Sequence, residues 1–65
     1  MITAMKGRQR DRFKLNTDGS WDIISDVYLT AYRKYSCKTS RRVSQREGLE
    51  ILARLERKGF TITTD

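Results

Sequence analysis

The chain has 65 residues, of which 14 are Lys or Arg and 8 are Asp or Glu, so its formal net charge is +6. With no histidine and a single cysteine, it offers neither an intrachain disulfide nor the four ligands of a His/Cys zinc site. No stretch approaches the ~18 consecutive apolar residues of a membrane-spanning helix. These counts predict one small basic domain, and the lone thiol with no apolar secretory segment predicts a cytoplasmic location.

The N-terminal segment carries the first cluster of positive charge. Residues 1–11 have no sustained hydrophobic periodicity, and five cations stand against one acid between residues 6 and 14. We therefore expect residues 1–11 to form a flexible basic arm and residues 12–65 to form a single compact domain.

A β-hairpin is predicted directly after this arm. Residues 12–16 and 20–24 both begin with alternating polar and apolar side chains, and Asp18-Gly19 between them is a strong turn signal. The buried side of this hairpin is expected to consist of Phe13, Leu15, Trp21 and Ile23.

The next segment, residues 25–37, is compatible with two structures. A helix would form a continuous apolar stripe from Ile24 to Tyr35, whereas a strand is favoured by the β-branched and aromatic content. The helix is slightly preferred, and both alternatives stay open. Residues 36–43 are polar and cationic and are expected to form a loop.

A helix over residues 44–58 has both a start and a stop signal. Ser44 and Glu47 form a capping box, and Gly59 supplies a left-handed terminating residue. Gly48 interrupts the apolar face, which reflects either tolerance near the first turn or the close approach of another element. A short edge strand over residues 60–64 completes the prediction of a small α+β domain with an N-terminal hairpin and one or two helices.

Residues 51–62, which include Leu55-Glu56-Arg57-Lys58-Gly59-Phe60, resemble the end of a winged-helix DNA-binding domain, where a recognition helix turns into a wing strand. Too little sequence follows Gly59 for a two-stranded wing, and the predicted hairpin lies at the opposite end. The chain is therefore not assigned to that family.

The sequence contains few residues that could act in catalysis. Cys37 lies among cations that would favour its thiolate, but no histidine is present to act as a base. Asp18, Asp22 and Asp26 are explained by a turn, a strand and a helix cap. We therefore expect a protein that is not an enzyme and that needs no cofactor.

The distribution of charge is the most informative feature of the sequence. Residues 27–46 contain six cations and no acid, whereas the rest of the predicted helix is neutral by count. Clustered positive charge attracts polyanions, and the arginine fork suits phosphates and base edges. Because this cluster leads into the N-terminus of the predicted helix, we expect a regulatory nucleic-acid-binding protein, with DNA favoured over RNA. The expected binding residues are Arg8, Arg10, Arg12, Arg33, Lys34, Lys38, Arg41, Arg42, Ser44, Gln45 and Arg46, and Tyr32 and Tyr35 are candidates for stacking on bases.

A second hypothesis is a small inhibitor or adaptor of the kind that mobile elements encode. Its basic face would bind an acidic protein, or its edge strand 60–64 would extend the sheet of a partner. A membrane partner is not expected, because the cationic segments lack a broad apolar face. Self-association as a homodimer is left open.

Overall fold

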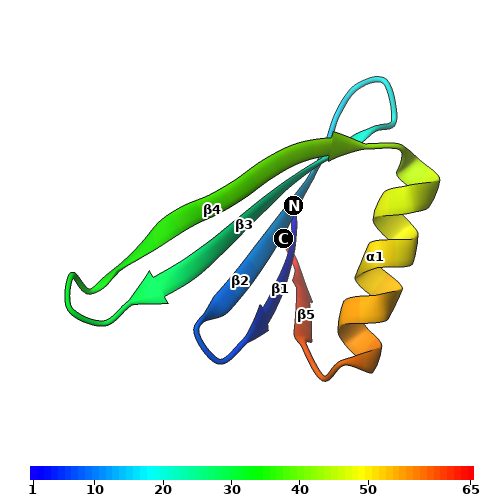
Figure 1. Cartoon of the computed structure of the whole chain (residues 1–65). Helices are drawn as coiled ribbons and strands as arrows, with labels where there is room; N and C mark the ends of the chain where they lie inside the picture. The colour runs from blue at the N-terminus through cyan, green and yellow to red at the C-terminus, as the bar shows by residue number, and fades with distance from the viewer.

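The computed structural model describes all 65 residues as one antiparallel sheet with a single helix packed on one side (Figure 1). The strand order is β4-β3-β2-β1-β5, so β4 and β5 are the two edges. The elements are β1 (Ile2–Lys6), β2 (Gln9–Leu15), β3 (Trp21–Leu29), β4 (Lys34–Val43), α1 (Gln45–Arg57) and β5 (Thr61–Thr64). The predicted small α+β domain with a C-terminal edge strand is thereby confirmed. No helix is long and apolar enough to cross a membrane.

The hairpin of β2 and β3 forms where the turn signal predicts it. Leu15 pairs with Trp21, and Gly19 adopts a φ of 88° that suits glycine. The Asp18 carboxylate accepts hydrogen bonds from the Ser20 backbone N–H and hydroxyl, at 2.9 and 2.6 Å. This local hydrogen bonding fixes the turn and with it the register of both strands.

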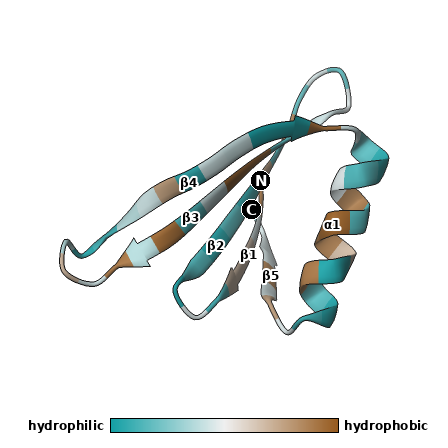
Figure 2. Ribbon diagram, in the orientation of Figure 1, coloured by the Kyte–Doolittle hydropathy of each residue, from teal (hydrophilic) through white to brown (hydrophobic).

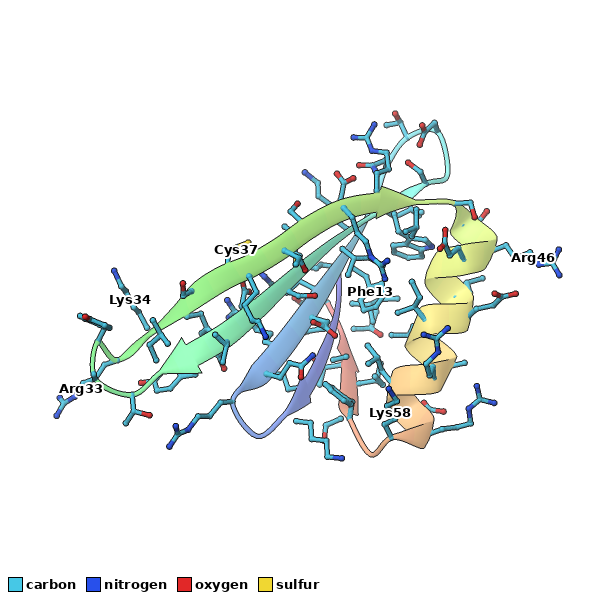
Figure 3. All side chains as sticks on the ribbon, in the orientation of Figure 1. Phe13, Arg33, Lys34, Cys37, Arg46 and Lys58 are labelled. Carbon is cyan, nitrogen blue, oxygen red and sulfur yellow. The ribbon has the colours of Figure 1, made fainter.

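Alternation along the strands gives the sheet two different faces. The helix face lies under α1 and carries the core residues Ala4, Phe13, Trp21, Ile23 and Val43, and Leu55 of α1 completes this core. Leu15, expected on the buried side of the hairpin, is 52 % exposed. Ile51 and Leu52 of α1 pack against this core, and Figure 2 shows that α1 carries both hydrophobic and hydrophilic residues. Figure 3 shows Phe13 between sheet and helix. The other face, here called the open face, has no element packed on it. Among its residues are Arg10, Arg12, Lys14, Asp22, Ile24, Asp26, Tyr28, Tyr35, Cys37, Ser40 and Arg42.

Helix α1 begins and ends as predicted. The Ser44 hydroxyl accepts a hydrogen bond from the Glu47 backbone N–H at 3.1 Å. Gly59 has a φ of 93°, and the Phe60 N–H donates to the Leu55 carbonyl at 3.1 Å. Gly48 marks a close approach, because a Cβ atom there would lie 2.2 Å from Cδ1 of Trp21. Gly48 therefore reflects the close approach of another element and not mere tolerance near the first turn.

Three predictions for individual segments are wrong. The segment 25–37 is not a helix, because its first part completes β3 and residues 30–33 form a turn into β4. Residues 36–43 belong to β4 and not to a loop. The expectation of a flexible arm over residues 1–11 also fails.

The N-terminal segment instead lies inside the sheet, between β2 and β5. Ala4 is completely buried in β1, which pairs with both neighbours. The Lys6 ammonium donates to the Lys58 carbonyl at the end of α1, at 2.6 Å. A cation expected to be mobile therefore satisfies a carbonyl at the negative end of the helix dipole, and all 65 residues contribute to one domain.

Candidate nucleic-acid interface

Strand β4 carries a large share of the protein's positive charge along one edge of the sheet. Lys34, Lys38, Arg41 and Arg42 lie on it without any acidic residue, and Arg33 precedes it. Figure 3 shows Arg33 and Lys34 at the hairpin tip, at the end of the molecule farthest from α1. Because α1 carries three arginines and three glutamates, the excess positive charge lies on the sheet side of the molecule, in residues 33–42 and residues 6–14.

A β-bulge distributes these charges over both faces of the sheet. Ser25 pairs with Thr39, but Asp26 pairs with Cys37, so Lys38 is the extra residue. Arg41 and Lys34 consequently lie on the helix face, and Arg42 lies on the open face. The bulge and the Lys and Arg side chains also protect this ten-residue edge from pairing with another strand.

Two arginines of β2 converge on one carboxylate of β3 on the open face. The side chain of Asp26 is 3 % exposed. Its Oδ2 accepts hydrogen bonds from Nε and Nη2 of Arg10 at 3.1 and 2.9 Å. Nε of Arg12 lies 3.2 Å from the same oxygen, an ion-pair contact without hydrogen-bond geometry. One buried negative charge thus holds two positive groups in place and leaves a net positive cluster on this face.

An aromatic pair continues this cluster toward the hairpin tip. The Arg10 guanidinium lies 3.7 Å from the ring centroid of Tyr35, within the range of a cation–π contact. Tyr28, which pairs with Tyr35 across the two strands, meets its ring edge-on at a centroid distance of 5.2 Å. Arg10 is therefore restrained by a carboxylate and by an aromatic ring at once.

The opposite end of the open face carries an exposed ion pair. Nε of Arg42 donates to Oδ1 of Asp22 at 2.9 Å. This hydrogen bond lowers the pKa of Asp22 below its ordinary value of 3.8 and raises the pKa of Arg42. Hydrogen bonds from Ser20 similarly lower the pKa of Asp18 in the neighbouring turn.

The structure does not bring the predicted binding residues together on one surface. Residues 41 and 42 point to opposite faces of β4, and Arg8 lies in the turn between β1 and β2. On α1, Arg46 points away from the sheet (Figure 3) and forms an ion pair with Glu50 at 3.4 Å. Ser44 is the helix cap, and Gln45 lies near the turn at Gly19.

Most of the predicted binding residues therefore lie on strands of the sheet and not around the N-terminus of α1. Arg10, Arg12 and Arg42 share the open face, and Arg33, Lys34 and Lys38 follow the hairpin tip and the β4 edge. Sequence reasoning did not include Lys14, Tyr28 or Asp26 in the site. Lys14 could be found from the alternation of Arg10, Arg12 and Lys14 along β2, which places three cations on one face. Asp26 and Tyr28 join the site only through the pairing of β3 with β2 and β4.

The expected stacking pair is also divided. Tyr35 packs against Arg10 on the open face, whereas Tyr32 lies in the hairpin turn with 71 % of its surface exposed.

In comparisons with known proteins, no family model, curated protein or solved structure is similar to this chain.

Proposed function

We propose that this chain is a small nucleic-acid-binding protein, of a regulatory kind, whose binding surface is the open face together with the β4 edge. The observation that carries the proposal is the Arg10–Arg12–Asp26 cluster beside a strand with four cations and no acid. Two positioned guanidinium groups next to a basic edge spread positive charge over several strands, which suits an extended polyanion such as a sugar-phosphate backbone better than a small ligand.

Preorganisation is the physical reason for favouring this cluster over isolated surface charges. A free arginine side chain loses rotamer entropy when it binds, about 2 kcal/mol at most. Arg10 is already fixed by Asp26 and Tyr35, so a large part of that cost is met during folding. The side chains of Arg10 and Arg12 are 24 % and 33 % exposed, and their Nη groups that do not contact Asp26 can donate to phosphate oxygens, which accept paired hydrogen bonds from a guanidinium.

The helix is less suited to this role. Its first turn lies against Trp21, its N-terminal N–H groups are partly satisfied by Ser44, and the arginine of its first turn, Arg46, is paired with Glu50. We propose DNA ahead of RNA as the partner, and the cytoplasm as the location.

Fluorescence anisotropy with labelled duplex DNA, single-stranded DNA and RNA tests the proposal. The test variant is Lys34→Gln/Lys38→Gln/Arg41→Gln, and the matched control Arg46→Gln/Arg54→Gln/Arg57→Gln removes three charges from α1. Each lost phosphate contact lowers the slope of log K against log salt by about 0.9. The test variant should therefore lose affinity and most of three slope units, while the control should change little. Failure of the wild type to bind any nucleic acid at ~50 mM salt contradicts the proposal.

The second candidate, an adaptor or inhibitor that binds a protein, is favoured by the other edge of the sheet. The outer edge of β5 is unpaired, and its four residues, Thr61–Thr64, carry no charge. This edge lacks the protection that β4 has, so a strand from a partner can extend the sheet there. Replacing Thr64, whose backbone N–H points away from β1, with Pro would remove a donor that a partner strand needs at this edge and leave nucleic-acid binding unchanged.

A further inference from the structure

We infer that the nucleic acid bound by this chain is B-form duplex DNA, and that the end of the β3–β4 hairpin and the β4 edge enter its major groove. This inference rests on the proposed function and adds the form of the ligand and the mode of binding. It depends on how the bulge arranges charge around the hairpin.

The cations surround the hairpin and do not lie on one side of it. Lys34 and Arg41 project from the helix face, Arg42 projects from the open face, and Lys38 sits at the bulge on the outer edge. A single strand lying on a sheet meets phosphates from one side only. A groove places a phosphate backbone on each side of the inserted element, so cations on both faces can contact phosphates. If a single strand lay on one face of the sheet, the cations of the other face would contact no phosphate.

The shape of this part of the molecule also fits a groove. Strand β2 begins at Gln9, opposite Val27, and the Arg8 carbonyl accepts a hydrogen bond from the Tyr28 N–H, so residues 29–34 form the part of the hairpin that has only two strands. Lys38, Arg41 and Arg42 follow behind it along the β4 edge. In Figure 1 this two-stranded ribbon extends well beyond β1, β2 and α1. Two paired strands are about 5 Å apart, and the major groove of B-form DNA, about 12 Å wide, admits a two-stranded ribbon.

The turn at the tip presents further groups to a ligand. Arg33 has a φ of 53°, an uncommon conformation for a residue other than glycine. The adjacent Tyr32 is 71 % exposed, and no aromatic or cation–π contact involves it. The tip therefore carries an arginine and an aromatic ring at the leading end of the ribbon, the side-chain types that contact base edges and phosphates.

The same geometry argues against duplex RNA. The major groove of A-form RNA is deep and too narrow for a ribbon, and its wide minor groove is shallow. A ribbon with charge on both faces cannot place both sets of cations near phosphates there. The expected order of affinity is duplex DNA above single-stranded DNA and above duplex RNA of the same sequence.

Two double variants separate groove insertion from a one-sided platform. Lys34→Gln/Arg41→Gln removes two charges from the helix face, and Lys14→Gln/Arg42→Gln removes two from the open face. Groove insertion predicts that each pair weakens duplex DNA binding about tenfold or more at ~100 mM salt and reduces the salt slope by up to about two. Arg54→Gln/Arg57→Gln on α1 is the matched control, and thermal unfolding verifies that all variants fold.

Three results would overturn the inference while leaving nucleic-acid binding intact. They are tighter binding of single-stranded DNA than of duplex DNA, equal binding of duplex RNA, and no effect of the helix-face pair. Absence of binding to all three ligands would instead contradict the proposed function itself. The two failures are thus distinguishable in one set of titrations.

Discussion

Replacement of Gly48 by alanine should destabilise the fold, although alanine is the better helix former. The Cβ atom would lie 2.2 Å from Cδ1 and 2.8 Å from Cγ of Trp21. Trp21 is 8 % exposed, and its ring packs edge-on against Phe13 at 6.4 Å. Since the indole is enclosed by the core, α1 must shift away from the sheet to make room.

The magnitude follows from two opposing effects. Alanine gains up to about 1 kcal/mol in helix propensity, whereas overpacking a core costs about 1–3 kcal/mol. A 2.2 Å separation corresponds to the upper end of that cost, so we expect a net loss of about 2 kcal/mol in the free energy of unfolding. A domain of this size has about 3–10 kcal/mol in total. The melting temperature should therefore fall by roughly 8–16 °C.

Thermal and urea unfolding, followed by circular dichroism and Trp21 fluorescence, measure this effect. Ala53→Gly at an exposed helix position isolates the propensity contribution and should cost about 1 kcal/mol. In a Trp21→Ala background, the cost of Gly48→Ala should fall by at least half, because Cγ, Cδ1 and Nε1 of the indole are all removed. A stabilising Gly48→Ala variant would refute the packing of α1 on Trp21.

Three further predictions concern the carboxylates and the helix cap. Asp26→Asn should lower the free energy of unfolding by about 1–3 kcal/mol, since two cations lose a buried partner. Asp22→Asn, at an exposed ion pair, should change the urea midpoint less. Equal effects of the two substitutions would contradict the difference in burial between Asp26 and Asp22. The lowered pKa values of Asp18 and Asp22 mean that their stabilisation is complete above the ordinary value of 3.8 and is lost as the pH falls below it. Urea titrations between pH 5 and 2 should accordingly show a flatter decline for Asp18→Asn/Asp22→Asn than for the wild type, and identical curves would exclude this origin. Ser44→Ala should cost about 1 kcal/mol by removing the N-cap, and an unchanged melting temperature would show that the hydroxyl is dispensable.

The parts of the fold that the sequence predicts correctly are those with local signals. Asp18-Gly19 defines its turn within four residues, and Ser44 and Gly59 define the two ends of α1. The turn at residues 30–33 has no glycine, proline or asparagine, and its left-handed position is occupied by Arg33. Without a turn signal, one strand-turn-strand segment resembles a helix followed by a loop.

Strand β1 was missed for a different reason. Its pairing with β5 joins Ile2 to Thr64, residues at opposite ends of the chain. Such non-local pairing leaves no trace in local periodicity. The buried Ala4 gives no alternating pattern, because the small alanine is followed directly by the apolar Met5.

The candidate site was predicted in its residue types but not in its arrangement. Simple alternation places Lys34 and Arg42 on the same face, since eight residues separate them. The bulge at Lys38 reverses that relation and puts them on opposite faces. The Arg10–Asp26 contact depends on the register of β2 and β3. The position of the turn is compatible with this register, but the sequence of the turn alone does not predict the contact.

The salt dependence of duplex DNA binding tests the central claim most directly. Anisotropy titrations of the wild type and of Lys34→Gln/Lys38→Gln/Arg41→Gln between ~50 and ~200 mM salt give both affinity and slope. The proposed interface predicts steep salt dependence for the wild type and a slope reduced by up to about three for the variant. Absence of wild-type binding, or equal slopes for the two proteins, would contradict a nucleic-acid interface on the β4 edge.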